Sequence, residues 1–197
     1  MSIKWGVLGT GGIAREFTED VITHTEMTIS AVGSRNLDKA NSFREGVKGF
    51  GSYEELVNSD VDAIYVATPH QAHCENTILA LNAGKPVLCE KPFAVNAIQA
   101  RAMANAAKEN NLLLMEAMWT RYLPHIQKVR ELMHELGEIH NVQADHGQSL
   151  LHINRLTDPN YAGGALLDLG IYPISFAYFV FGKPEKVTAK GVVENGV

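Results

Sequence analysis

The chain has 197 residues, of which 46% are hydrophobic and 20% are charged, with a formal net charge of −5. This composition predicts a soluble globular protein with a substantial core, forming one large domain or slightly more. Because Lys and Arg are scattered, we expect neither nucleic acid nor a membrane as a partner. The presence of only Cys74 and Cys89 excludes a disulfide framework and favours a reducing cytoplasm.

The first predicted element is a strand, a tight turn and a helix. An apolar run over residues 3–8 predicts a buried strand, and Gly9-x-Gly11-x-x-Ala14 follows it, before a helical pattern through Thr23. This glycine pattern also occurs in ordinary βα turns. After a strand, it lets a pyrophosphate approach the backbone and the free N–H groups of the helix. We therefore predict a dinucleotide held by Gly9, Thr10, Gly11, Gly12 and Ile13.

The end of the second predicted strand, residues 27–32, bears on the choice of coenzyme. An acidic residue here would bind the ribose 2′-OH of NAD, whereas a nearby Arg accommodates the 2′-phosphate of NADP. The sequence supplies Ser34 and Arg35, with no acid before Asp38. We therefore predict NADP, with NAD possible. The alternative is that Arg35 is a solvated loop cation and that Asp38 caps a helix over 37–45.

The remainder of the first 120 residues alternates between strand and helix patterns. We predict strands over 48–50, 62–67, 86–89 and 112–116, and helices over 52–58, 71–83 and 96–110. Gly84 is the expected residue just past the end of one helix. This alternation predicts an α/β fold with a doubly wound parallel sheet and right-handed crossovers. Its ligand is expected beyond the carboxyl ends of the strands.

After residue 120 the pattern changes to that of an α+β domain. We predict a helix over 124–136, a strand over 139–148, an irregular stretch over 149–164, an apolar helix over 165–181 and a strand over 186–193. The predicted domains are therefore a dinucleotide-binding domain, 1–120, and the first part of a second domain, 121–197. Because only Val197 follows the hairpin signal Asn195-Gly196, we expect the chain to be part of a longer protein.

The apolar helix contains two polar side chains with a spacing suited to one helix face. Asp168, Gly170 and Pro173 interrupt the run, which is slightly short for a membrane span, so we predict a buried helix that Pro173 kinks or restarts. Asp168 and Tyr172 are four residues apart. A buried carboxylate needs a partner, which Tyr172 or Lys91 could supply. The alternative is a structural helix with a capping Asp and a core Tyr.

Lys91 follows Glu90 directly after a predicted buried strand, where a doubly wound sheet places its ligand. A lysine there could transfer a proton or orient a substrate hydroxyl, although a Glu90 to Lys91 surface pair would have the same sequence. Four other candidates are histidines, at positions 70, 73, 146 and 152. His70-x-x-His73 has ligand-like spacing, but no further cluster accompanies it, so we predict no metal site.

Taken together, the motifs resemble the Gfo/Idh/MocA oxidoreductase family, nearest to its dimeric dihydrodiol dehydrogenase and NADP-dependent D-xylose dehydrogenase branch. The motifs that carry the resemblance are Gly9-x-Gly11-x-x-Ala14, Thr68-Pro69-His70-x-x-His73, Glu90-Lys91-Pro92, residues 115–121 with Trp119 and Arg121, and residues 163–172 with Asp168 and Tyr172. The resemblance implies a Rossmann domain followed by a domain with a mostly antiparallel sheet, which commonly forms a dimer interface. The full-length form is then expected to be a homo-oligomer.

The resemblance also implies roles for residues of this chain. Lys91 would lie by the nicotinamide and the reacting hydroxyl, Tyr172 would occupy the acid/base position and Asp168 would be the motif's aspartate. The implied coenzyme-binding residues are Thr68, Pro69, His70, His73, Glu90, Lys91, Trp119 and Arg121. Trp119 and His146 would lie near the substrate.

These observations predict an enzyme that transfers a hydride between NADP and a sugar or vicinal diol. Tyr172 would carry the proton, Lys91 would polarise the oxygen and Asp168 would hold this pair in register. One alternative is a non-catalytic NAD(P)-sensing regulator, which needs only the phosphate cradle. Another is an NAD-dependent cyclitol dehydrogenase.

Overall fold

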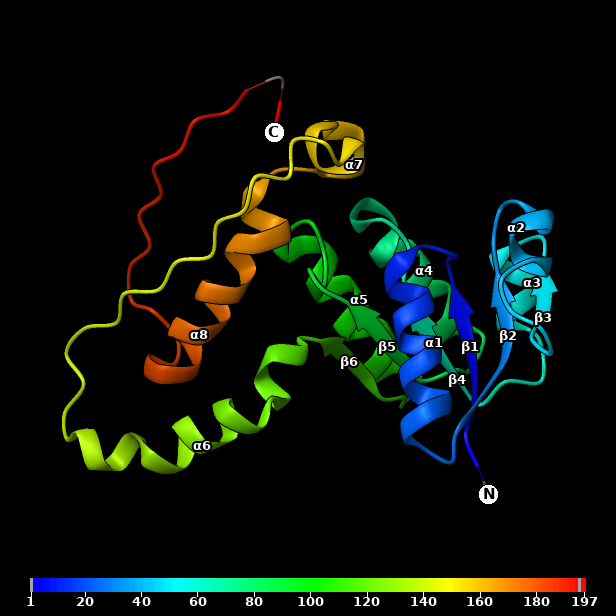
Figure 1. Cartoon of the computed structure of the whole chain (residues 1–197), viewed down its shortest axis with the longest axis horizontal. Helices are drawn as coiled ribbons and strands as arrows, with labels where there is room; N and C mark the ends of the chain where they lie inside the picture. Colours follow the sequence, from blue (N-terminus) through cyan, green and yellow to red (C-terminus); the bar gives the residue numbers. More distant parts are fainter. Residues whose placement is uncertain (1, 195) are drawn as a thin grey trace. The chain divides into compact units, whose positions relative to one another are not determined.

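The computed structural model describes residues 2–194 and 196–197 of the chain. It divides the chain into two compact units, of which the first ends at Ala117 and the second begins at Met118 (Figure 1). The predicted turn Asn195-Gly196 includes Asn195, which lies outside the described residues.

The first unit is built on a parallel sheet of six strands in the order β3-β2-β1-β4-β5-β6. The strands are β1 (Lys4–Leu8), β2 (Thr28–Gly33), β3 (Lys48–Phe50), β4 (Ala63–Val66), β5 (Val87–Glu90) and β6 (Leu114–Ala117). The helices between them are α1 (Gly12–His24), α2 (Leu37–Asn41), α3 (Tyr53–Val57), η1 (His70–Ala72), α4 (His73–Asn82) and α5 (Ala97–Glu109). This order confirms the predicted doubly wound sheet.

Both faces of the sheet are covered, which explains why its strands are nearly continuous apolar runs. Side chains alternate between the faces along each strand. Val7 and Tyr65 pack with Ala14 of α1 on one face, while Leu8 and Ile64 belong to the core on the other face with α3, α4 and α5. In Figure 1 the blue helix α1 crosses in front of the strands of this unit.

Local hydrogen bonds and backbone conformation determine where the helices begin and end. Asn36, and not Asp38, caps α2, because its side-chain oxygen accepts the backbone N–H of Lys39 at 3.0 Å. This helix ends at Asn41, four residues earlier than predicted, and Phe43 then turns into the core. Gly84 follows the end of α4 with a φ of +77°, as predicted.

The second unit contains helical elements joined by extended chain. These are η2 (Trp119–Tyr122), α6 (Pro124–Leu132), η3 (Met133–Leu136), α7 (Asn154–Thr157), η4 (Pro159–Tyr161), the π-helical turn η5 (Leu166–Gly170) and α8 (Ile171–Phe181). In the part of this unit that the structure describes, the segments 139–148 and 186–193 are extended but form no strand. The predicted strands are therefore wrong for these segments, because neither gains the partner that a ladder requires. The antiparallel sheet stays a prediction.

The apolar helix of the second unit is mostly half-buried, so the prediction of a buried helix is wrong for most of its residues. Leu166 is 66% exposed and Ile174 is 52% exposed, and Ser175 is the buried residue of α8. Within this unit, one side of α8 lines a pocket together with residues of η2 and α6 and with residues 144–146. By length and composition, Pro159–Phe181 is the one helical segment among the described residues that could cross a membrane. Pro173 lies in the first turn of α8, consistent with the predicted restart of the helix.

Gly9 fixes the turn between β1 and α1. Its φ is +111°, and a Cβ built on it would lie 2.6 Å from the carbonyl oxygen of Ala67. The backbone N–H of Gly9 donates to the carbonyl oxygen of Gly33 at 2.9 Å, and that of Ala67 donates to Leu8 at 2.9 Å. The ends of β1, β2 and β4 are thereby tied around a position that excludes a side chain.

We predict that Gly9→Ala lowers the free energy of unfolding by about 3 kcal/mol, since it adds both backbone strain and a clash with a carbonyl oxygen. Chemical denaturation of the coenzyme-free protein measures this change. Gly12→Ala is the matched control, because a Cβ at Gly12 meets nothing within 4 Å. Equal losses for the two variants would contradict the close approach at Gly9.

Candidate active site

The glycine turn has the features that a pyrophosphate needs. Gly11 is the N-cap of α1 and no side chain caps this helix, so the first N–H groups of α1 have no side-chain acceptor. A Cβ at Gly11 or Gly12 would meet nothing within 4 Å, which shows open space in front of these groups. Ala14 is fully buried beneath the turn, as predicted for close packing of helix and strand. These residues fit the phosphates of a dinucleotide.

The residues after β2 combine a buried hydroxyl with an exposed cation. Ser34 is buried, and its backbone N–H donates to Phe50 at 3.1 Å. The next residue, Arg35, is exposed, and its charge opposes the rise that burial causes in the pKa of Tyr53 at the start of α3. The choice between a coenzyme-binding Arg35 and a solvated loop cation stays a prediction. Sequence reasoning missed Tyr53.

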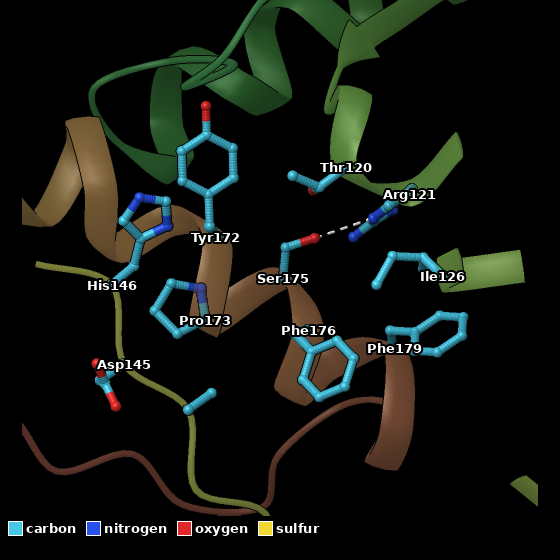
Figure 2. Close-up of a pocket in the computed structure, with 11 residues that line it drawn as sticks. Thr120, Arg121, Ile126, Asp145, His146, Tyr172, Pro173, Ser175, Phe176 and Phe179 are labelled. Atoms are coloured by element: carbon cyan, nitrogen blue, oxygen red, sulfur yellow. Dashed lines mark hydrogen bonds between the residues drawn. The ribbon is translucent and has the colours of Figure 1, made fainter. Parts of the chain in front are cut away.

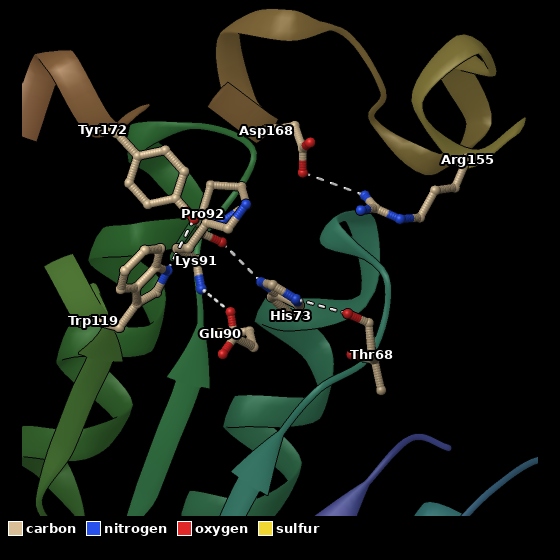
Figure 3. A network of polar contacts seen from close by, with 9 residues as sticks. All are labelled: Thr68, His73, Glu90, Lys91, Pro92, Trp119, Arg155, Asp168 and Tyr172. Carbon is tan, nitrogen blue, oxygen red and sulfur yellow. Dashed lines mark hydrogen bonds and ion pairs between the residues drawn. The ribbon is translucent and has the colours of Figure 1, made fainter. Parts of the chain in front are cut away.

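His73 connects the segments that follow β4 and β5. Its Nδ1 lies 2.8 Å from the carbonyl oxygen of Pro92, and its Nε2 lies 2.8 Å from that of Thr68 (Figure 3). The ring is 1% exposed, so burial lowers the pKa of His73, and the charge of Lys91 acts in the same direction. The Thr68 hydroxyl accepts a hydrogen bond from Asn76 at 3.1 Å. The predicted Thr68 to His73 motif thus joins two strand ends.

Glu90 is enclosed at the end of β5. The Tyr65 hydroxyl donates to one of its oxygens. The backbone N–H of Lys91 donates to the other at 3.1 Å (Figure 3). Burial raises the pKa of Glu90, and these two hydrogen bonds oppose that shift. Glu90 therefore fixes the backbone of Lys91 from a buried position, which contradicts the alternative of a surface pair. The Lys91–Pro92 peptide bond is cis.

In the second unit, the structure brings together three predicted site residues. The indole N–H of Trp119 donates to the hydroxyl oxygen of Tyr172 at 3.0 Å (Figure 3). The imidazole of His146 stacks on the Tyr172 ring, with the ring centroids 5.1 Å apart and an interplanar angle of 22°. Trp119 is 50% exposed. The Tyr172 oxygen thus accepts a hydrogen bond from Trp119.

A pocket of about 220 Å³ adjoins these aromatic residues within the second unit. Tyr172 and His146 lie at one end, and Phe176 and Phe179 lie at the other (Figure 2). Arg121 lines its side, where its Nε donates to the hydroxyl of Ser175 at 3.0 Å. The walls therefore combine apolar rings with one cation.

Asp168 is 5% exposed in the π-helical turn that precedes α8. Arg155 of α7 approaches its carboxylate, with Nη1 and Oδ1 3.5 Å apart (Figure 3). We predicted Tyr172 or Lys91 as the partner, and sequence reasoning missed Arg155. π-helical turns are frequent at functional sites. The geometry gives Asp168 a cationic partner from its own unit.

The predicted site residues fall into two groups. Those of the first unit surround the carboxyl ends of β1, β2, β4 and β5, and those of the second unit gather around Tyr172, with Asp168 in the preceding turn. Among the described residues, no group of three or more His, Cys, Asp and Glu side chains is arranged to hold a metal ion. The catalytic and binding roles stay predictions.

Family models match both parts of the sequence. One described as "Oxidoreductase family, NAD-binding Rossmann fold" matches residues 3–118, and one for the GFO/IDH/MocA C-terminal domain matches residues 126–196. The chain belongs to the Gfo/Idh/MocA oxidoreductase family. The resemblance inferred from the motifs is therefore confirmed, as is the Rossmann fold of the first unit.

Among the curated relatives, trans-1,2-dihydrobenzene-1,2-diol dehydrogenase of Bos taurus is 41% identical over 97% of this chain and 60% of its own length. The D-xylose 1-dehydrogenase (NADP(+)) of Hypocrea jecorina is 40% identical over 90% of this chain and 52% of its own length. The chain thus spans about 60% or less of the length of these two relatives.

Solved structures also resemble the chain. KijD10, a 3-ketoreductase from Actinomadura kijaniata in complex with NADP and TDP-benzene, has a TM-score of 0.78 and 32% identity, over 92% of this chain and 58% of its own. The scyllo-inositol dehydrogenase of Lactobacillus casei has a TM-score of 0.79 over 92% of this chain and 57% of its own. At 21% identity, the second shows the shared fold alone.

The buried ring of His73 generates a prediction about pH. Since burial lowers its pKa in the folded state, the neutral ring favours folding above the ordinary value of about 6.5, and this contribution is lost as the pH falls. We predict that the stability difference between the wild type and His73→Gln shrinks on acidification, by up to about 1.4 kcal/mol per pH unit. Urea unfolding at a series of pH values measures it.

His24→Gln, which removes an exposed imidazole at the end of α1, is the control for loss of a histidine. A stability difference that instead grows on acidification would contradict the prediction. It would mean that the two carbonyl oxygens, of Thr68 and Pro92, hold His73 as an imidazolium, which donates to both.

Proposed function

We propose that this chain carries the coenzyme site and the reacting residues of an oxidoreductase that transfers a hydride between NADP and a CH–OH carbon of a sugar or vicinal diol. Membership of the Gfo/Idh/MocA family supports the reaction class. The names of the dihydrodiol and D-xylose dehydrogenases support the substrate class. Arg35 at the end of β2, where an acidic residue would suit NAD, supports NADP.

The observation that carries the proposal is the position of Lys91. It directly follows β5, at the edge of the sheet where β1 ends in the uncapped glycine turn. Its backbone is hydrogen bonded to Glu90, and the carbonyl oxygen of Pro92 contacts His73. A lysine so fixed next to a dinucleotide cradle is suited to bind the oxygen of a reacting alcohol or carbonyl group.

A bound nicotinamide would supply the hydride acceptor, and the chain would have to remove the proton of the substrate hydroxyl. In our proposal Lys91 donates a hydrogen bond to the substrate oxygen and stabilises its developing negative charge. Tyr172 carries the proton, and its hydrogen bond from Trp119 fixes the position of its phenol oxygen. His146, stacked on Tyr172, would line the substrate position.

We predict that Lys91→Met lowers kcat by at least about a hundredfold, since it removes the group that stabilises charge on the oxygen. The dissociation constant for NADPH should stay unchanged, because the phosphate cradle is intact. A panel of pentoses and vicinal diols with NADP, followed by the absorbance of the reduced nicotinamide, measures turnover. NADPH fluorescence measures binding.

Lys108→Met, at the exposed end of α5, controls for loss of a cation. Full turnover in Lys91→Met would remove the lysine from the mechanism. Tight NADPH binding by a wild-type chain that turns over no substrate of the panel would favour the NAD(P)-sensing alternative.

We predict that Arg35→Met raises the dissociation constant for NADPH by about 10- to 100-fold, as expected for loss of a charged hydrogen bond. The constant for NADH should be unchanged, because NADH has no 2′-phosphate. Parallel fluorescence titrations of the two coenzymes measure both constants. Equal weakening of NADPH and NADH would show that Arg35 does not select the 2′-phosphate.

A further inference from the structure

The segment that follows β5 consists of Lys91, Pro92 and Phe93. Because proline has no N–H, only Lys91 and Phe93 supply backbone donors in this segment. The N–H of Lys91 donates to the carboxylate of Glu90 at 3.1 Å. The N–H of Phe93 donates to Oε1 of Glu116, in β6, at 2.9 Å. Each backbone donor of the segment is therefore paired with a carboxylate.

The two carboxylates reach this segment from opposite faces of the sheet. Glu116 of β6 pairs in register with Cys89 of β5, so these two side chains lie on the same face, and Cys89 belongs to the core with α4 and α5. Glu90 is the next residue along β5, so its side chain lies on the other face, where the Tyr65 hydroxyl donates to it. The end of β5 thus has one carboxylate on each face.

Further contacts hold the segment between its two donors. The carbonyl oxygen of Pro92 lies 2.8 Å from Nδ1 of His73 (Figure 3). The Phe93 side chain packs against the core with α4 and α5, and Sγ of Cys89 lies 3.8 Å from the carbonyl oxygen of Phe93. Side chains from β5, α4 and β6 therefore fix the backbone at Lys91 and at the two residues after it.

We propose that Glu116 is a positioning residue for Lys91, which acts by holding the N–H of Phe93. This inference rests on the proposed function, in which Lys91 binds the oxygen of the reacting group. A lysine has a long flexible side chain, so its ammonium group is placed accurately only where its backbone is fixed. The motif of residues 115–121 gave roles to Trp119 and Arg121, and Glu116 adds a third residue of that motif to the site.

The test uses two substitutions at Glu116. Glu116→Gln keeps a side-chain oxygen that accepts from Phe93, whereas Glu116→Met has a similar length and no oxygen. We expect Glu116→Met to lower kcat by about 10- to 100-fold, since small displacements of a catalytic group have effects of this size. Glu116→Gln should recover most of the wild-type rate, and the dissociation constant for NADPH should stay unchanged in both variants. The panel of pentoses and vicinal diols measures kcat, and NADPH fluorescence measures binding.

Hydrogen exchange followed by NMR tests the contact itself in the coenzyme-free protein. The Phe93 amide should exchange at least about tenfold faster in Glu116→Met, because a hydrogen bond to a charged group is lost. In Glu116→Gln it should exchange at close to the wild-type rate. The Val87 amide donates to Leu113 at 2.9 Å within the sheet, so its retained protection shows that each variant is folded.

Two further comparisons separate positioning from a general loss of structure. In a Lys91→Met background, Glu116→Met should cause little further loss of kcat, because it acts through Lys91. Glu109→Met, at the exposed end of α5, is the matched control for removal of a carboxylate and should leave kcat and Phe93 exchange unchanged.

Unchanged exchange of Phe93 or unchanged kcat in Glu116→Met would overturn the inference and leave the proposed function standing. So would the same fold-loss of kcat with and without Lys91, or a Glu116→Gln variant as slow as Glu116→Met. A wild type that turns over no substrate of the panel overturns the proposed function and the inference together.

Discussion

The close approach of Gly9 to the end of β4 is the constraint on which the first unit depends. The carbonyl oxygen of Ala67 occupies the space that a side chain at position 9 would need. This contact lets β1, β2 and β4 end at one level, and the residues after those ends are the ones proposed to bind the coenzyme. The site therefore follows from strand register, since parallel strands that end together present their loops at the same edge.

Buried polar groups beneath this edge give the loops their positions. Tyr65 and Glu90 share a hydrogen bond on neighbouring strands, and His73 contacts two carbonyl oxygens. Burial shifts the pKa of Glu90 up and that of His73 down, and both shifts favour the neutral form. Glu90 and His73, whose charged forms burial disfavours, therefore fix the backbone of Lys91 and Pro92 through hydrogen bonds.

The strands of the first unit could be predicted because the central ones, such as β4, are buried on both faces and because turn residues bound them. The contact between Tyr65 and Glu90 follows from strand geometry. Tyr65 pairs with Leu88, and Glu90 lies on the same face as Leu88 because it is two residues further along the strand. The contact of Arg155 with Asp168 could not be predicted in this way, because an irregular segment with no period separates them. The position of Tyr53 near the charge of Arg35 was missed for a related reason, because it depends on how α3 packs on the end of β2.

The second unit shows what an alternating pattern of apolar and polar residues predicts and what it leaves open. Period-two alternation over 139–148 indicates a surface that one face of a sheet could bury, but it does not specify a partner, and the segment forms no ladder here. His146 nevertheless reaches Tyr172, and Trp119 donates to the same side chain. Aromatic stacking and one hydrogen bond need only proximity of side chains, whereas a strand needs a continuous partner. Tyr172 is therefore ordered by contacts that do not require a sheet.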